Sequence, residues 1–531
     1  MLLLITRLFD VLIIVFLLFL LLLGFLFSYN FYFKRYRLPP GPTPLPLVGN
    51  LHQMHRTTPE QLFLVWRRQY GDVFTVWMGE QPVVCVVDYA KIMAHFQRDG
   101  DAFAGRLVHS EFEKAMHGGV AFMGLIFTEG DLWREQRRFT LRVLRDFGLS
   151  KELMQRRILQ ELQPLFLQID AHIESDEELN MGRLLEVAVA SIINNLLFGY
   201  RFDKDNLEQF NELKQLLYEH FAISVHPLTA LFRLSPRLFR HLPFLRGKFN
   251  RTQMVYRNLD AFFERQIDEH ILKMNQLQDN DKTEPTDFVE AFLKEKAKLD
   301  GNGGDAMHNF SIEQLRGICN DLWSAGQDTI SNTLAWGIAF LIHHPQIQAK
   351  MSDELQRAVD DDDEDEHQRT NGAKNQTVTV ANRLKLPYTN AVICEIQRVA
   401  NLAAFNVPRK LSRDVTIDGH LLKAGTVVCP QISAVLMDEK IFENPTQFCP
   451  ERFLDENGKL KRVNELIPFS IGKRQCLGES LARMELFLFV ANLFKQYKFS
   501  AGAKMPSLER KMGATIKCQN FTCRVSRNIA N

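Results

Sequence analysis

The feature that most constrains this chain is an uninterrupted apolar run near its N-terminus. Residues 11–27, VLIIVFLLFLLLLGFLF, include no polar side chain. As an α-helix rising ~1.5 Å per residue, the run would cover roughly 26 Å, close to the thickness of the hydrocarbon layer of a bilayer. A cleaved signal peptide would have a shorter apolar region that ends in small residues, and those are missing here. The run therefore predicts an uncleaved membrane anchor.

An aromatic collar and a group of cations follow the run. The cations are Lys34, Arg35 and Arg37. Such a flank marks a membrane interface and predicts that the rest of the chain lies on the cytosolic side, so residues 1–37 are interpreted as an anchor with a basic flank. Residues 38–50, LPPGPTPLPLVGN, contain too many prolines for a helix. They predict a semi-rigid hinge that holds the body at a fixed angle to the membrane.

The body, residues 51–531, is long enough for a large core in one big domain or in two to three smaller ones. The net charge of the chain is +1, which gives no basic field for nucleic acid. No two of the eight cysteines have CxxC spacing. This disfavours zinc and redox-dithiol sites and favours small buried thiols in a reduced compartment.

Most of the body has helical patterns, with short extended pieces between them. Residues 73–88 predict a strand pair, and residues 415–430 a hairpin with turns at Asp418-Gly419 and Ala424-Gly425. Two polar insertions follow residues 277 and 359. Residues 278–305 enclose a short helical piece, and residues 360–376 carry an acidic run. A metal site is an alternative for that run, but a solvated loop is favoured.

A long helix is predicted in the centre of the chain. Ser311 and Gln314 have the spacing of a capping box, and the helical pattern continues to Pro345, which gives a helix of ~50 Å. Its middle, AGQDT at residues 325–329, is a poor helix interior, because Gly326 costs up to ~1 kcal/mol relative to alanine.

This AGQDT stretch carries chemistry as well as irregularity. The Thr329 hydroxyl can donate back to the Ala325 carbonyl and loosen the turn. Gly326 would let a flat ligand lie against the backbone. Asp328 beside Thr329 supplies an acid and an alcohol that can relay protons. The alternative is a helix irregularity without function.

A second motif pairs opposite charges. Glu395 and Arg398 lie at i, i+3 on one helical face, and Arg452 follows in the sequence PERF. One carboxylate receiving both guanidiniums would pin a loop to a helix through bidentate hydrogen bonds. The alternative is an ordinary surface pair of little energetic value.

The most specific motif is residues 469–478, FSIGKRQCLG. It places Phe469, Gly472, Arg474, Cys476 and Gly478 in the pattern F-x-x-G-x-R-x-C-x-G, just before a helical stretch. The glycines allow a sharp turn and a close approach to a flat group. A thiolate at a helix N-terminus is stabilised by free N–H groups and by the helix dipole. These parts describe a thiolate ligand to a haem iron with a cation for a propionate, against the alternative of a buried structural thiol.

These motifs, in this order, resemble cytochrome P450, the family of haem-thiolate monooxygenases. The resemblance covers the whole chain and is strongest to the microsomal animal clan that metabolises xenobiotics and steroids. Two further segments carry it. Trp133 and Arg137 in DLWREQRRF match the family's W-x-x-x-R, and NVPRKLSRDV brings Arg409. The resemblance implies a mainly α fold with small β-sheets, behind a single N-terminal transmembrane helix, with residues 51–531 as the haem-thiolate catalytic domain.

The resemblance also implies roles for these residues. Cys476 would be the axial ligand of haem b (heme b), and Asp328 with Thr329 would deliver protons to bound dioxygen. A structural triad would consist of Glu395, Arg398 and Arg452. The residues expected to bind the cofactor are Trp133, Arg137, Arg409, Phe469, Gly472, Arg474 and Gly478.

Electrons must come from outside, because the sequence has no strand–G-x-G-x-x-G–helix unit for a nicotinamide or flavin. The family's usual donor is NADPH–cytochrome P450 reductase, with cytochrome b5 as an additional candidate partner. Arg134, Arg138 and Lys473 are candidates for its docking face. The implied location is the endoplasmic reticulum membrane, crossed once, with the catalytic domain in the cytosol.

The expected substrate is lipophilic: a sterol or steroid, a fatty acid or a xenobiotic. Residues 228–249 mix apolar and basic side chains and are predicted to dip into the bilayer and admit such molecules, against the alternative of an ordinary amphipathic loop. Arg233, Arg237 or Arg240 could steer a carboxylate or face lipid headgroups. The side chains expected to make the pocket apolar are Phe122, Met123, Phe405 and Met512.

Two alternative functions come from other classes. A haem-thiolate isomerase or dehydratase would rearrange a peroxide without a reductase, but such enzymes often lack the threonine that this chain has at position 329. A non-catalytic haem- or ligand-binding membrane protein would have no need for Asp328 and Thr329 beside Cys476.

Overall fold

The computed structural model describes residues 2–54, 58–120, 123–147, 152–276, 284–301, 308–360, 377–511, 513 and 515–528. The predicted acidic loop, beyond Asp360, and the pocket residues Phe122 and Met512 lie outside these ranges, as do the two ends of the 278–305 insertion. The helical piece expected inside that insertion is present as α13 (Phe288–Gly301).

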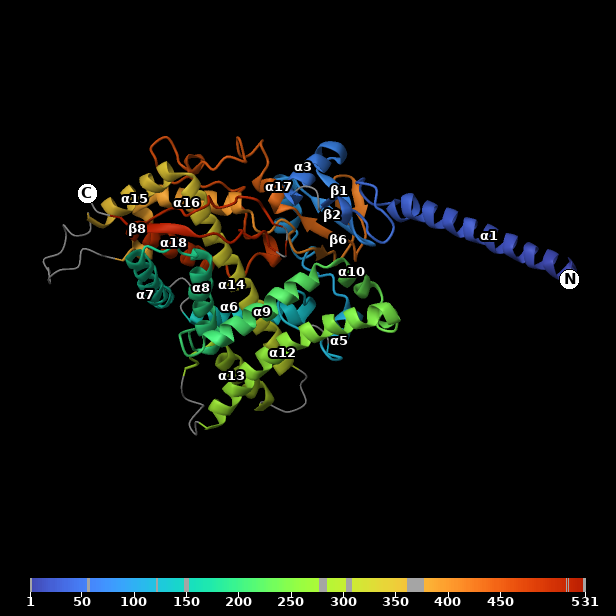
Figure 1. Ribbon diagram of the computed structural model, residues 1–531, viewed down its shortest axis with the longest axis horizontal. Helices are drawn as coiled ribbons and strands as arrows, with labels where there is room; N and C mark the ends of the chain where they lie inside the picture. The colour runs from blue at the N-terminus through green and yellow to red at the C-terminus, as the bar shows by residue number, and fades with distance from the viewer. Residues whose placement is uncertain are drawn as a thin grey trace.

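The chain is mainly helical, as expected, and the described residues form three small sheets (Figure 1). The helices of the first half are α1 (Leu2–Phe31), α2 (Leu51–Met54), α3 (Pro59–Tyr70), α4 (Tyr89–Ile92), α5 (Ser110–Met116), α6 (Gly130–Asp146), α7 (Glu152–Ser175), α8 (Met181–Phe198), α9 (Leu207–Ser224), α10 (Pro227–Leu234), α11 (Pro236–Phe239) and α12 (Pro243–Gln276). After α13 come α14 (Ile312–His343), α15 (Pro345–Asp360), α16 (Pro387–Ala400), α17 (Ile432–Leu436) and α18 (Glu479–Gln496). Short helical turns are η1 (Phe33–Arg35), η2 (Met93–Arg98), η4 (Val380–Lys385), η5 (Pro450–Phe453) and η6 (Gly472–Arg474).

The largest sheet joins distant parts of the chain. The strands of the structure are β1 (Val73–Met78), β2 (Gln81–Val86), β3 (Arg409–Lys410), β4 (Val415–Ile417), β5 (His420–Leu422), β6 (Val427–Pro430), β7 (Tyr497–Ala501) and β8 (Cys523–Arg527). The order β1-β2-β6-β3 places the predicted pair β1–β2 beside two strands from more than 300 residues later, and β6 runs parallel to β2. The predicted hairpin is only half right. β4 and β5 turn at Asp418-Gly419, but β6 leaves them for the larger sheet because its four residues are fully buried there.

The core is organised around α14, which crosses the middle of the body (Figure 1). Two glycines allow its closest neighbours to approach. A Cβ on Gly326 would lie 3.2 Å from the Ile193 side chain of α8, and one on Gly337 would lie 3.0 Å from Ile396 of α16. The expectation that Gly326 faces a flat ligand is therefore wrong, because α8 covers the bare side of this residue. Ser311 caps the helix by accepting from the Gln314 N–H at 3.1 Å, as predicted.

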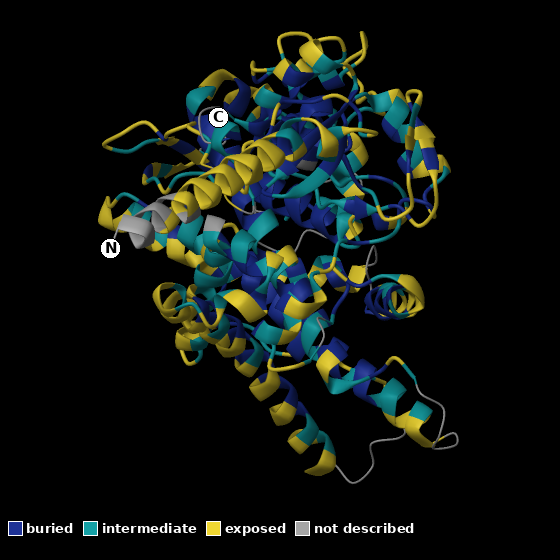
Figure 2. Ribbon diagram, turned by 90° about the vertical axis from the view of Figure 1, so that its right-hand side faces the viewer, coloured by how far each residue is buried: buried dark blue, intermediate teal, exposed yellow. Residues whose placement is uncertain are grey.

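The N-terminal helix α1 stands apart from the core. Its apolar side chains are exposed along residues 12–23 and 25–27, as Figure 2 shows for this helix. The stretch of residues 12–35 is long and apolar enough to cross a membrane and is not buried in the body. α8 passes the same test of length and composition, but it is mostly buried and serves as a core helix.

The flank after α1 is attached to the body rather than free. Lys34 donates to Glu80 at 2.9 Å, lies over the Trp77 ring and is only 4% exposed. This cation of the predicted flank is therefore paired within the body. The proline segment contains no helix, as predicted, and hydrogen bonds to β1, where the Thr75 N–H donates to the Pro40 carbonyl at 3.0 Å.

Candidate functional site

The cysteine loop is folded tightly by its own backbone and by a glycine. The Cys476 N–H donates to the Phe469 carbonyl at 2.9 Å, and the Gln475 N–H donates to Gly472 at 3.0 Å. Gly472 has φ +74°, and a Cβ there would lie 1.9 Å from the Phe96 carbonyl oxygen. The close approach that requires this glycine is thus to protein backbone. Gly478, by contrast, has φ −87° and no neighbouring protein atom beside its Cα.

Cys476 is the one exposed cysteine among the eight, all of which lie in the described ranges. Burial nevertheless raises the pKa of its thiol, which means that protein surrounds it closely. Both findings agree with a thiol that faces an internal space. The sequence argument that the helix N-terminus lowers this pKa is only partly right. The Gly478 N–H and Arg137 do lower it, but the effect of burial is larger.

A tryptophan and an arginine are packed face to face beside this loop. Arg474 lies with its guanidinium carbon 3.7 Å from the centroid of the Trp133 ring. Both side chains are buried, at 7% and 5% exposure. Arg474 donates to the carbonyls of Ala104, Leu125 and Thr128 at 2.7, 3.3 and 2.6 Å. The loop is thereby bonded to segments 346 to 370 residues earlier in the chain.

Two more of the expected arginines converge on the same loop. Arg137 donates to the Gln475 carbonyl at 2.7 Å. Arg409, which is 1% exposed, donates to the Ser470 hydroxyl at 3.0 Å and to the Ile471 carbonyl at 2.8 Å. Its Nη1 is buried and has no hydrogen-bond partner among the described residues. A guanidinium with an unused buried donor is the usual signature of a missing acceptor.

Sequence reasoning missed a fourth arginine at this site, the buried Arg106. Its side chain donates to the carbonyls of Ile126, Val407 and Pro408 at 2.8, 3.0 and 2.9 Å. Only the sequence FAGR, a cation directly after a glycine in an apolar stretch, hinted at it. We call Arg106, Arg137, Arg409 and Arg474 the arginine cluster.

The arginine cluster has too little negative charge around it. Burial and mutual repulsion lower the pKa of Arg106 to about 10, of Arg409 to about 9 and of Arg474 to about 8. Glu129 is the one carboxylate among the described residues that raises the pKa of Arg474, and it is already paired with Lys410 at 2.6 Å. The cluster is therefore a site for an anionic group.

The segment after residue 122 links the cysteine loop to α14. The Leu125 and Ile126 N–H groups donate to the buried Asp321 carboxylate of α14 at 2.6 and 2.9 Å, while the Leu125 carbonyl accepts from Arg474. Gln314 bonds both the N–H and the carbonyl of Gly124. Gln314 therefore serves this contact and not the second half of a capping box.

The acid and the alcohol of α14 lie where the sequence placed them, but they are not bonded to each other. The Thr329 hydroxyl donates to the Ala325 carbonyl at 2.7 Å, as predicted. The Asp328 carboxylate accepts from Lys517 at 2.8 Å and from the Thr515 hydroxyl at 2.9 Å. The acid is thus turned toward the C-terminal loop.

The charge triad has the geometry that its spacing suggested. Arg398 binds both oxygens of Glu395, at 2.7 and 2.8 Å, and both residues are fully buried. Arg452 adds a contact to Glu395 at 3.2 Å. The remaining donors of Arg398 bind carbonyls of the loop around residues 436–447. Phe469 packs against the large core, under the guanidinium of Arg483.

Comparison with known proteins identifies the family. The family described as "Cytochrome P450" matches residues 39–523. Cytochrome P450 2C3 of Oryctolagus cuniculus is 32% identical over 464 residues, which cover 87% of this chain and 88% of the relative. Cytochrome P450 2M1 of Oncorhynchus mykiss is 32% identical over 470 residues, covering 88% and 87%. Cytochrome P450 2B4 of Oryctolagus cuniculus is 33% identical over 470 residues, covering 88% of each.

Members of this family carry haem, whose iron is bound through a cysteine. The described residues include no group of three or more His, Cys, Asp or Glu side chains that could hold a metal ion. Haem supplies four ring nitrogens and two propionates, and this chain offers one open thiol beside a cluster of uncompensated arginines. The residues present fit the group. The chain therefore belongs to the cytochrome P450 family, and it is a haem-thiolate monooxygenase.

Proposed function

We propose that this protein inserts one atom of O2 into a lipophilic substrate, with electrons from NADPH–cytochrome P450 reductase. The observation that carries the proposal is the open Cys476 thiol, set beside the arginine cluster and linked by residues 124–126 to the acid–alcohol helix α14. The expected substrates are sterols or steroids, fatty acids or xenobiotics.

The roles of the residues follow from their positions. Haem bound to a thiolate supplies the oxygen chemistry, because the thiolate pushes electron density that favours O–O cleavage. Cys476 is the residue that would ligate the iron. Arg137, Arg409 and Trp133 would hold the propionates, and we add Arg106 to them because its guanidinium is buried in the same cluster. Arg474, whose donors are bound to carbonyls, contributes charge.

On the other side, α14 would supply protons. Thr329 carries a hydroxyl next to the loosened turn at Ala325, and Asp328 carries a carboxylate that reaches the partly exposed Lys517. An acid and an alcohol in sequence can pass protons from solvent to a reacting atom. Residues 104–126 and 402–408 are the segments that would surround the substrate.

We propose that the reductase docks on the face where α6 crosses the cysteine loop. Arg137 of α6 contacts the loop backbone, and Arg134 and Arg138 on the same helix are exposed, as is Lys473. A hollow of about 760 Å³ beside the same loop adds Lys461, Arg462 and Arg483 to this surface. Exposed cations steer acidic partners and make association salt-dependent.

We propose a single-pass anchor in the endoplasmic reticulum membrane, with the catalytic domain in the cytosol. α1 projects from the end of the body that also holds α10 (Figure 1). Near α10, exposed apolar side chains include Val225, Leu234, Leu238 and Phe244, and the last is 75% exposed. Both surfaces would face lipid, and lipophilic substrates would enter from it.

Reconstitution tests the proposed function. The full chain, placed in phospholipid vesicles with the reductase, is supplied with NADPH and a panel of steroids, fatty acids and aromatic xenobiotics under ¹⁸O2. The account expects a product that carries one ¹⁸O atom, with NADPH consumed. Rearrangement of a fatty-acid hydroperoxide, added to the panel, without NADPH and without label from O2 would assign the protein to peroxide rearrangement instead.

A further inference from the structure

The acid of α14 is held by residues that no motif includes. Lys517 binds one oxygen of the Asp328 carboxylate at 2.8 Å, and the Thr515 hydroxyl donates to the other at 2.9 Å. Both partners belong to the loop that precedes β8. Asp328 and Thr329 point about 100° apart on the helix, so the carboxylate that meets this loop is turned away from the threonine.

The same loop is clamped along one face of α14. Asn332 donates to the Ile516 carbonyl at 2.6 Å and accepts from the Cys518 N–H at 2.9 Å. Trp336 donates to the Ile516 carbonyl at 3.4 Å. Asp328, Asn332 and Trp336 are four residues apart and share a helix face. The Asn332 and Trp336 contacts fix the loop backbone, which in turn fixes where Thr515 and Lys517 present their side chains.

Stability alone does not explain the contact with Lys517. The Lys517 side chain is 42% exposed, and an ion pair so open to water contributes less than about 1 kcal/mol. The Asp328 side chain is only 13% exposed. The lysine therefore adds little to folding, but it connects a nearly buried carboxylate to solvent and selects one orientation for it.

We propose that Lys517 and Thr515 are positioning residues that hold the Asp328 carboxylate and so control its proton delivery. The inference deepens the proposed function and rests on it. Each productive turnover uses one O2, two electrons and two protons to form hydroxylated product and one water. If protons arrive at the wrong place, the same O2, electrons and protons leave as H2O2. A carboxylate that has lost its fixed orientation shifts the outcome toward peroxide.

The partition can be measured without knowing the substrate. In the reconstituted holoenzyme, reduced O2 leaves either as H2O2, after two electrons and two protons, or as two waters, after four of each. Peroxide formed per NADPH oxidised and the solvent deuterium isotope effect on NADPH oxidation are read for wild type, Lys517→Met and Thr515→Val. Both variants are expected to raise the peroxide fraction severalfold and to change the solvent isotope effect. Steps that depend on proton transfer should slow by up to about tenfold.

Three controls separate positioning from other roles. Lys517→Arg keeps the ion pair and should restore the wild-type partition, whereas a lysine that itself relays protons would not be replaced by arginine. Lys498→Met, an exposed lysine on β7, should change nothing. Asp328→Asn should raise peroxide, and adding Lys517→Met to it should have no further effect, because the lysine acts through the acid.

Several results would contradict a positioning role for Lys517. A wild-type partition in Lys517→Met, or additive effects of Lys517→Met and Asp328→Asn, would overturn the inference. The unfolding midpoint of each variant, measured by circular dichroism, should be no lower than the midpoint of Lys498→Met. A much lower midpoint in Lys517→Met would mean that Lys517 is a structural residue. Failure of the proposed function would show instead in the wild type, as an absence of NADPH-dependent O2 consumption.

Discussion

Two sets of buried arginines in this molecule are held in opposite ways. Arg398 is fully buried and binds both oxygens of the equally buried Glu395, and its other donors are filled by loop carbonyls. Arg409 is as deeply buried, yet among the described residues it has no carboxylate partner and one of its nitrogens is unbonded. Its pKa is lowered to about 9 by burial and by the other arginines. The two arginines are therefore buried to the same extent but differ in whether a carboxylate balances their charge.

The difference separates structure from function. The triad is complete within the chain, so its charges serve the fold. The arginine cluster lacks such a counter-charge among the described residues, and we propose that a haem propionate supplies it. Because buried charge without a counter-charge is costly, we expect an anionic ligand to occupy the arginine cluster.

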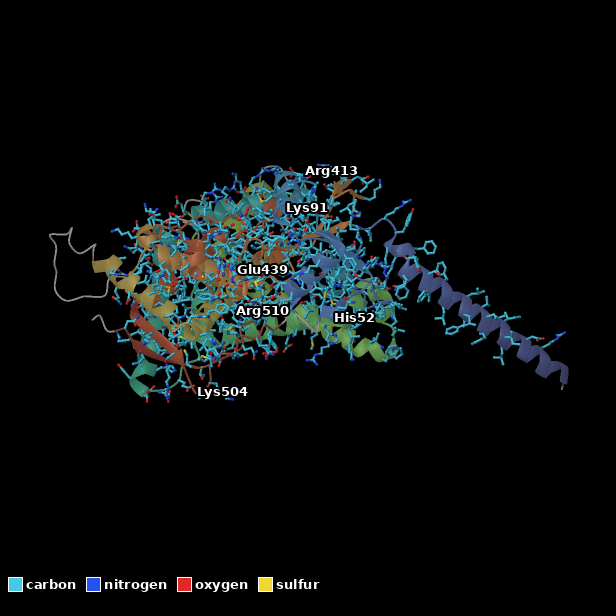
Figure 3. All side chains as sticks on the ribbon, turned by 90° about the horizontal axis from the view of Figure 1, so that it is seen from above. His52, Lys91, Arg413, Glu439, Lys504 and Arg510 are labelled. Carbon is cyan, nitrogen blue, oxygen red and sulfur yellow. The ribbon has the colours of Figure 1, made fainter. Side chains whose placement is uncertain are left out.

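The largest effect on stability is expected from disrupting the charge triad. Glu395→Gln leaves Arg398 buried without a counter-charge and should lower the free energy of unfolding by about 3–5 kcal/mol. Urea unfolding followed by circular dichroism measures it. Glu439→Gln, at an exposed glutamate labelled in Figure 3, is the matched control and should be neutral. A loss below about 1 kcal/mol for Glu395→Gln would mean that the triad is not a closed structural unit.

A smaller effect is expected from the two glycines of the cysteine loop, Gly472 and Gly478, which should differ in how much stability is lost on substitution by alanine. Gly472→Ala forces a side chain into positive φ and onto the Phe96 carbonyl, so we expect a loss of about 3 kcal/mol. Gly478→Ala meets open space at negative φ and should leave the haem-free protein as stable as before. Thermal unfolding of both haem-free variants tests the pair. Equal destabilisation would refute the distinction between a glycine needed by the fold and one that is not.

The arginine cluster should show the opposite behaviour: loss of one arginine should leave stability unchanged and weaken haem binding. Arg409→Met removes a repelled, underbonded cation, so it should not destabilise the haem-free protein. It should weaken haem binding by about 1.5–3 kcal/mol, the value of a hydrogen bond to a charged group. Haem transfer to an acceptor apoprotein should accordingly run roughly ten- to a hundredfold faster. Arg413→Met, at an exposed arginine paired with Asp99 and labelled in Figure 3, should transfer haem at the wild-type rate. Unchanged haem loss in Arg409→Met would contradict the assignment.

The smallest effect, taken per pH unit, is expected from a buried acid. Glu485 of α18 is buried, its Oε2 has no hydrogen-bond partner among the described residues, and burial raises its pKa to about 8. The neutral form is favoured in the fold, so its stabilising effect is complete below about pH 4.5 and is lost as the pH rises toward 8. Relative to Glu485→Gln, the wild type should lose up to about 1.4 kcal/mol of unfolding free energy per pH unit over that range. The free energy of unfolding is measured against pH for both proteins. If the two profiles have the same slope, the pKa of Glu485 is not raised by folding.

The sequence was most informative where chemistry requires fixed spacing. The loop around Cys476, the Glu395–Arg398 pair and the back-bonding of Thr329 all depend on neighbours within a few residues, so local pattern was enough to predict them. Arg106 and Lys517 were missed because each acts on residues about 190 to 300 positions away, and the chain path that brings them there is set by tertiary packing. Gly326 was misread for the same reason, since only the crossing with α8 shows which side of it is covered.

The most direct test of the account is the carbon monoxide difference spectrum of the reduced, detergent-solubilised protein, beside that of Cys476→His. The account predicts a Soret band near ~450 nm in the wild type and its loss in the variant, because the band reports thiolate ligation by this cysteine. A band near ~420 nm in intact wild type would mean a neutral thiol or nitrogen ligand. It would contradict the role of Cys476 and the monooxygenase mechanism that depends on it.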